Sequence, residues 1–171
     1  MSLRWLDLRD PDGACEIFTP PALIRETLDQ FPPECFLPGK TFLEPSCGNG
    51  NFLVEIVAYK LRAGCTPLEA IKDIYAVELM ADNVLVSRYR TLKAAGLLGN
   101  SQAQKIVEKQ IRQGDFLKDP TGTDEYWETP QPIRFEDLKD TIEANVPYLK
   151  EMGVPPFEVL RSARKRRTRR A

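Results

Sequence analysis

The sequence predicts an α/β fold built around a parallel sheet with helices on both faces. Three apolar runs indicate the strands, and they lie at Thr41–Leu43, Ile71–Glu78 and Lys105–Leu117. Amphipathic, helix-like stretches separate these runs, and a glycine-rich turn joins the first run to the helix that follows it. Strands that alternate with helices form parallel sheets with right-handed connections. We therefore expect a ligand to bind where the strands end, at their carboxyl edge.

Length and composition are typical of one water-soluble domain. The chain has 171 residues, of which 42% are hydrophobic and 29% charged. A chain of this length can bury its own hydrophobic core. It contains no apolar run long enough to cross a membrane, and its start lacks the basic and apolar regions of a secretory signal. We expect one domain over residues 1–160.

Cysteine and histidine usage excludes several classes of site. The four cysteines are widely separated, and the chain has no histidine. These features argue against a zinc site, a disulfide scaffold and catalysis by a serine–histidine or cysteine–histidine pair. Free cysteines fit a reducing compartment, so we expect a cytoplasmic protein that holds no metal.

The net charge is unevenly distributed along the chain. Of 24 basic and 25 acidic residues, seven basic ones and no acidic one follow Leu160. Residues 1–160 therefore hold 17 basic and 25 acidic residues, a net charge of −8. An acidic body is poorly suited to binding phosphates over a broad face. The basic segment 161–171 is predicted to be either a disordered tail or an arm that contacts nucleic acid.

The first half of the chain predicts a helix, a strand, a glycine turn and a second helix. Thr19 is placed to cap a helix that starts at the following prolines and continues to about Phe31. The strand Thr41–Leu43 comes next. Gly48 and Gly50 then allow a tight turn that brings the backbone close to a ligand. Apolar residues at helical spacing follow, namely Phe52, Leu53, Ile56, Val57 and Leu61.

Two further strands each lead to an acidic residue. Ile71–Glu78 is predicted to be the second strand, and a helix capped by Ala81, Asp82 and Asn83 follows it. A carboxylate at the end of such a strand can accept both hydroxyls of a ribose, so Glu78 is a candidate nucleotide ligand. The third strand ends in Gly-Asp-Phe-Leu, where Asp115 can accept a hydrogen bond and Phe116 can cover a ring.

The run from Leu43 to Phe52, Leu-Glu-Pro-Ser-Cys-Gly-Asn-Gly-Asn-Phe, resembles the first motif of class I S-adenosylmethionine-dependent methyltransferases. It is most similar to the adenine-N6 DNA methyltransferases of restriction-modification systems. The resemblance implies a Rossmann-like sheet, S-adenosylmethionine as cofactor and DNA as partner. It also implies roles for Phe-Thr-Pro at the methionine end, for Glu78 at the ribose and for Asp115 at the adenine amino group. The implied cofactor-binding residues are Phe18, Thr19, Pro20, Glu44, Pro45, Ser46, Cys47, Gly48, Asn49, Gly50, Asn51, Phe52, Glu78, Leu79, Asp115 and Phe116.

The base-binding motif of that family, Asn/Asp-Pro-Pro-Tyr/Phe, does not occur in this chain. Asn145-Val146-Pro147-Tyr148 is similar to the form found in ribosomal RNA adenine dimethyltransferases, and it makes Asn145 and Tyr148 catalytic candidates. Val154-Pro155-Pro156-Phe157 has the prolines and the ring without the polar acceptor. Glu136 and Asp137 follow a predicted fourth strand at Ile133–Phe135, where either carboxylate could accept a hydrogen bond from an amino group.

The resemblance covers roughly the first 117 residues, so three functional alternatives stay open. The first is an adenine-N6 DNA methyltransferase. The second is a non-catalytic, cofactor-binding partner or regulatory subunit, and the third is a methyltransferase for RNA, protein or a small molecule. We expect either a minimal or truncated methyltransferase sheet or a fragment. A second copy or another subunit could complete such a sheet.

Overall fold

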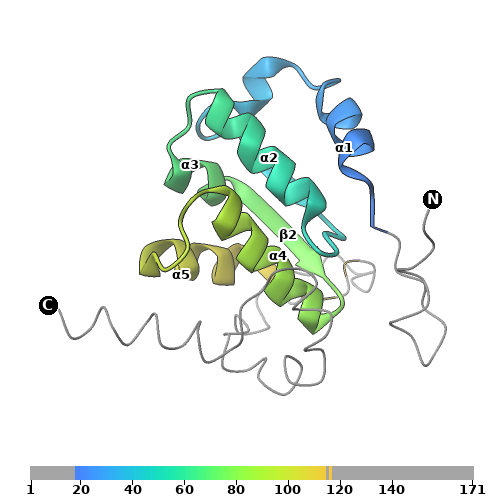
Figure 1. Cartoon of the computed structure of the whole chain (residues 1–171), viewed down its shortest axis with the longest axis vertical. Coiled ribbons are helices and arrows are strands. Elements are labelled where there is room, and N and C mark those ends of the chain that lie inside the picture. Colours follow the sequence, from blue (N-terminus) through green and yellow to red (C-terminus); the bar gives the residue numbers. More distant parts are fainter. Residues whose placement is uncertain (1–17, 115, 117–171) are drawn as a thin grey trace, which may run out of the picture.

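The computed structural model describes residues 18–114 and 116 (Figure 1). This part of the chain is a mixed α/β structure with a three-stranded parallel sheet. In chain order its elements are α1 (Pro21–Leu28), the 3-10 helix η1 (Pro33–Phe36), β1 (Phe42–Glu44), α2 (Asn51–Arg62), α3 (Pro67–Lys72), β2 (Ile74–Glu78), α4 (Ala81–Ala94), α5 (Ser101–Gln110) and β3 (Ile111–Gln113).

The strands lie side by side in the order β1-β2-β3, and both pairings are parallel. Glu44 lies opposite Ala76, and Glu78 lies opposite Gln113. Strand β2 therefore extends two residues past the end of β1. Because the strands are parallel, their carboxyl ends meet at one edge, where Glu44 ends β1 and Glu78 ends β2.

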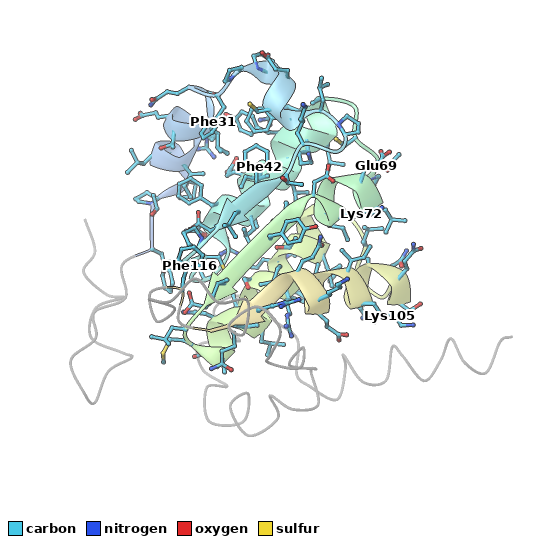
Figure 2. The ribbon with its side chains drawn as sticks, turned by 180° about the vertical axis from the view of Figure 1, so that it is seen from behind. Phe31, Phe42, Glu69, Lys72, Lys105 and Phe116 are labelled. Atoms are coloured by element: carbon cyan, nitrogen blue, oxygen red, sulfur yellow. The ribbon has the colours of Figure 1, made fainter. Side chains whose placement is uncertain are left out.

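The hydrophobic core lies between one face of the sheet and the helices. Figure 1 shows α2 and α4 in front of β2. The buried side chains of this core include Leu53, Val57, Ile74, Ala76, Leu92, Val107 and Ile111. In the view from behind, β1 and β2 face the viewer (Figure 2). Leu43 and Tyr75, which are opposite each other in the β1–β2 register, are 53% and 45% exposed. This face of the sheet is therefore open at Leu43 and Tyr75, whereas Val77, further along β2 on the same face, is only 3% exposed.

Two of the predicted strands are shorter than expected. Ile71 and Lys72 belong to α3, and β2 begins only at Ile74. Thr66 explains this difference, because it forms a capping box with Glu69 that starts a helix just before the apolar run. Residues 105–110 likewise belong to α5, and only Ile111–Gln113 form β3.

The expected helix caps are partly wrong. Pro20, not Thr19, is the N-cap of α1, and no side chain among the described residues caps that helix. Met80 is the N-cap of α4, so Ala81, Asp82 and Asn83 form its first turn. The helix predicted after the glycine turn is confirmed, and Leu53, Ile56 and Val57 are buried in it as expected.

A buried ion pair holds the amino end of the sheet. The side chain of Lys60 is fully buried, and its Nζ lies 2.9 Å from Oδ2 of Asp73. The same ammonium donates to the carbonyl oxygens of Leu37 and Lys40, at 3.2 and 2.7 Å. Asp73 also accepts a hydrogen bond from the Gly39 amide at 2.9 Å. Because each of the three ammonium protons has an acceptor, the charged Lys60 side chain can be buried.

Candidate site at the carboxyl edge of the sheet

The glycine turn between β1 and α2 is the centre of the candidate site. Gly48 and Gly50 have φ angles of +50° and +83°, in the left-handed region that favours glycine. The amide of Gly50 donates to the carbonyl of Cys47 at 2.8 Å and closes the turn. The amide of Cys47 donates to the carbonyl of Val77 at 3.0 Å, so the turn stays attached to β2 beyond the end of β1.

Glu78 connects the turn to the end of β2. Its Oε2 accepts the Gly48 amide and its Oε1 accepts the Met80 amide, both at 2.8 Å. Glu78 is only 5% exposed. The sequence predicted this acid as a ligand but did not predict that it binds the turn itself. A carboxylate has about four acceptor positions, and these two amides occupy two of them.

The segment before α1 packs against the turn from the other side. The side-chain Nδ2 of Asn51 donates to the carbonyl of Thr19 at 2.9 Å. A Cβ placed on Gly48 would lie 3.0 Å from ring atoms of Phe18. Phe18 and Thr19 therefore lie against the glycine turn, some 30 residues away in the sequence.

Helix α4 supports the turn, and no motif in the sequence signals this. A Cβ on Gly50 would lie 2.9 Å from the Cα of Ser87, so the turn and the helix backbone are in close contact. One turn further along α4, Nη1 of Arg90 donates to the main-chain carbonyl of Asn49 at 2.7 Å. Ser87 and Arg90 are three residues apart and so share one face of the helix. A small residue followed three positions later by a cationic one is the only sign of this support in the sequence.

Burial shifts the pKa of two groups, one at the end of β1 and one in the turn. Burial raises the pKa of Glu44, and a hydrogen bond from the Ser46 amide at 3.2 Å partly opposes this change. Burial also raises the pKa of the Cys47 thiol to about 12, and the nearby negative charge of Glu78 adds to the increase. Cys47 is therefore a protonated, buried thiol and not a nucleophile.

Exposed apolar side chains adjoin the carboxylates. Leu79 and Met80, directly after β2, are 58% and 42% exposed, and Phe116 is 37% exposed. Gln113 Nε2 donates to the Leu79 carbonyl at 3.0 Å, and the Gly114 amide donates to the Glu78 carbonyl at 2.9 Å. These bonds join the ends of β2 and β3, so the turn, the acid and the apolar side chains share one edge.

The remaining predicted site residues fall outside the described part of the chain. These are Asp115, Glu136, Asp137, Asn145 and Tyr148. Pro20, Pro45 and Ser46 are described and are exposed, and Phe52, the second residue of α2, has a partly buried ring. In residues 18–114 and 116 no group of acidic or cysteine side chains gathers as metal ligands would. Over the same residues, no helix is both long and apolar enough to span a bilayer.

No family model, no curated protein and no solved structure matches this chain. The chemistry of the site must therefore be inferred from its own residues. The edge offers main-chain donors at the start of α2, a buried carboxylate and an exposed apolar surface. Such a set suits a small ligand with hydroxyl groups, a charged end and a flat ring.

Proposed function

We propose that this protein binds S-adenosylmethionine and belongs among the class I methyltransferase-like proteins. The observation that carries the proposal is the meeting of three distant segments at one sheet edge. Phe18–Thr19 contact the glycine turn, and the turn is bonded to Glu78. The resemblance assigns these same segments to the methionine, the loop and the ribose.

The described residues fit such a cofactor chemically. The N-cap of α2 is Gly50, which supplies no side-chain acceptor, so the first amides of the helix can serve a carboxylate. Glu78 can accept from ribose hydroxyls, and Leu79 and Phe116 offer apolar surface to a ring. When bound, the sulfonium supplies an activated methyl group. The protein's task is then to orient an acceptor amine in line and to exclude water.

We further propose that the acceptor is adenine N6 in DNA. An enzyme of this kind extrudes the target base from the duplex and binds it at the edge of the cofactor pocket. Asn145, or alternatively Glu136 or Asp137, would accept hydrogen bonds from the amino group, and the ring of Tyr148 would cover the base. This part of the proposal is supported by the form of the first motif, Leu-Glu-Pro-Ser-Cys-Gly-Asn-Gly-Asn-Phe.

A cofactor-binding partner without transferase activity is the second candidate. The absence of Asn/Asp-Pro-Pro-Tyr from the sequence favours it. So does Glu78, whose two carboxylate oxygens already hold the main chain at Gly48 and Met80. Such a protein would bind the cofactor and leave base recognition to another subunit.

Calorimetry on the full chain tests cofactor binding. We expect micromolar-range binding of S-adenosylmethionine and S-adenosylhomocysteine, and about a 10- to 100-fold loss in Glu78→Gln, because a charged acceptor for two hydroxyls is removed. Glu69→Gln is the matched control, since Glu69 is an exposed acid of the α3 capping box. Absence of binding by the folded wild type would refute the proposal.

Methyl transfer separates the two candidates. With labelled cofactor and unmethylated duplex DNA, the enzyme transfers label to adenine, and Asn145→Ala or a Glu136→Ala/Asp137→Ala double variant abolishes transfer. Tight cofactor binding with no transfer to DNA or RNA supports the partner instead.

A further inference from the structure

Asn49 lies in the middle of the glycine turn and carries a buried acceptor without a partner. The residue is 5% exposed, and its side-chain Oδ1 has no hydrogen-bond partner within the described residues. Buried polar groups are almost always paired, so an orphaned amide oxygen requires an explanation. Gln110 Oε1 is the other such atom in the described part of the chain, but Gln110 directly precedes β3, at the opposite edge of the sheet.

The main chain around Asn49 is held in place while its side-chain oxygen stays unpaired. Arg90 donates to the main-chain carbonyl of Asn49 at 2.7 Å, and the next residue, Gly50, packs on the Cα of Ser87. The backbone of this residue is thus fixed from α4.

Asn49 also lies beside a set of donors. It precedes Gly50, the N-cap of the 12-residue helix α2, which no described side chain caps. Uncapped first-turn amides favour an anionic group, whereas an unpaired amide oxygen favours a cationic or neutral donor. A zwitterionic α-amino acid group can meet both requirements. Its carboxylate would accept from the helix amides, and its ammonium would donate to Oδ1 of Asn49.

We propose that Oδ1 of Asn49 accepts a hydrogen bond from the α-ammonium of the cofactor's amino-acid end and selects ligands that carry this group. This inference rests on the proposed function and adds to it a specificity-determining residue. It also explains the orphaned oxygen, because binding supplies the donor that the folded chain lacks around it. A functional residue of this kind is retained although it lowers the stability of the free protein.

The test compares ligands as well as variants on the full chain. Calorimetry measures S-adenosylhomocysteine and its deamino analogue, which keeps the adenosine and the carboxylate but lacks the α-amino group. The wild type should bind the deamino analogue about 10- to 100-fold more weakly, as expected for a hydrogen bond to a charged group. This comparison needs no variant and so cannot fail through misfolding.

Asn49→Leu and Asn49→Asp then locate the effect. Asn49→Leu, of similar shape, should bind S-adenosylhomocysteine about 10- to 100-fold more weakly and bind the deamino analogue like the wild type. Its melting temperature should be unchanged or higher, because no buried acceptor is left unpaired. Asn49→Asp keeps the acceptor and should retain the wild-type preference for the amino-bearing ligand.

The outcomes for Asn49 and for cofactor binding can be told apart. If the wild type binds S-adenosylhomocysteine and Asn49→Leu binds it equally well, the assignment of Asn49 is wrong and cofactor binding stands. The assignment is also wrong if Asn49→Leu is weakened equally toward both ligands, or if Asn49→Asp behaves like Asn49→Leu. If the wild type binds neither ligand, both proposals fail.

Discussion

At the scale of single residues, the glycine turn requires two positions without a side chain, for different reasons. Gly48 lies against the ring of Phe18, whose atoms a Cβ would meet at 3.0 Å. Gly50 lies against the backbone of α4, which cannot rotate away as a side chain can. The two glycines recognised in the sequence therefore differ in how strictly each is required.

Gly50→Ala should destabilise the protein by about 2–4 kcal/mol, the sum of left-handed strain and a forced shift of α4. Gly64→Ala is the matched control. Gly64 follows the other end of α2, has a φ of +93°, and has no described atom within 4 Å of its added Cβ. It should cost only the strain, about 1–2 kcal/mol. Urea unfolding of both variants gives the difference, and equal destabilisation would show that the close approach to Ser87 has no energetic weight.

Cys47 should be the slowest of the described cysteines to react with iodoacetamide at about pH 8. Its pKa of about 12, against an ordinary 9.0, lowers the thiolate fraction about 1,000-fold. Partly exposed Cys35 is the internal comparison. The pKa of Cys47 is higher in the folded than in the unfolded protein. The contribution of this thiol to the free energy of unfolding is therefore complete below pH 9.0 and is lost as the pH rises toward about 12. Site-resolved mass spectrometry measures the labelling; rapid modification of Cys47 in the folded protein would contradict this assignment.

At the scale of elements, the Lys60–Asp73 pair joins α2 to the residue before β2 and to the segment before β1. Residue type alone would place Lys60 on the solvent side of α2, yet its side chain is 0% exposed. A long apolar stem ending in an ammonium can be buried when three acceptors meet it, and no local pattern in the sequence indicates where those acceptors will lie.

Lys60→Met should cost about 3–5 kcal/mol, because it leaves the Asp73 carboxylate without its cation in a nearly buried place. Adding Asp73→Asn should recover much of that stability, since the double variant no longer buries a charge. Thermal unfolding of the two single variants and the double variant provides the coupling. Strictly additive effects would argue that the pair does not act as a unit.

The elements that the sequence predicted well are those with several agreeing local signals. The region from Gly48 to Leu61 combines turn glycines with helical apolar spacing, and α2 begins and ends close to the expected residues. The strand expected over 105–110 is wrong because Ile106 and Val107 favour strands locally, whereas Asn100 caps a helix through the amides of Gln102 and Ala103. A single capping side chain thus outweighed β-branched residues.

At the scale of the whole molecule, the candidate site depends on contacts that no linear motif contains. Four segments meet at it, and they come from before α1, from the glycine turn, from the end of β2 and from α4. The parallel order β1-β2-β3 makes the turn and the end of β2 predictable neighbours, since parallel strands end together. The support from Ser87 and Arg90 depends on how α4 packs, which the sequence does not specify by itself.

The charge distribution gives a prediction for the whole chain, because residues 1–160 carry a net charge of −8 and seven basic residues follow them. If the proposed DNA activity holds, removal of residues 161–171 should weaken DNA binding by a similar factor for all sequences. It should also reduce the slope of log affinity against log salt by about 0.9 for each phosphate that the protein no longer neutralises.

A variant with glutamine at all seven basic positions separates charge from length and should match the truncation. Calorimetry with S-adenosylhomocysteine should give the wild-type affinity in both variants, because the glycine turn and Glu78 are untouched. An unchanged salt slope would mean that the basic segment binds no phosphates and that the acidic body binds DNA by another surface.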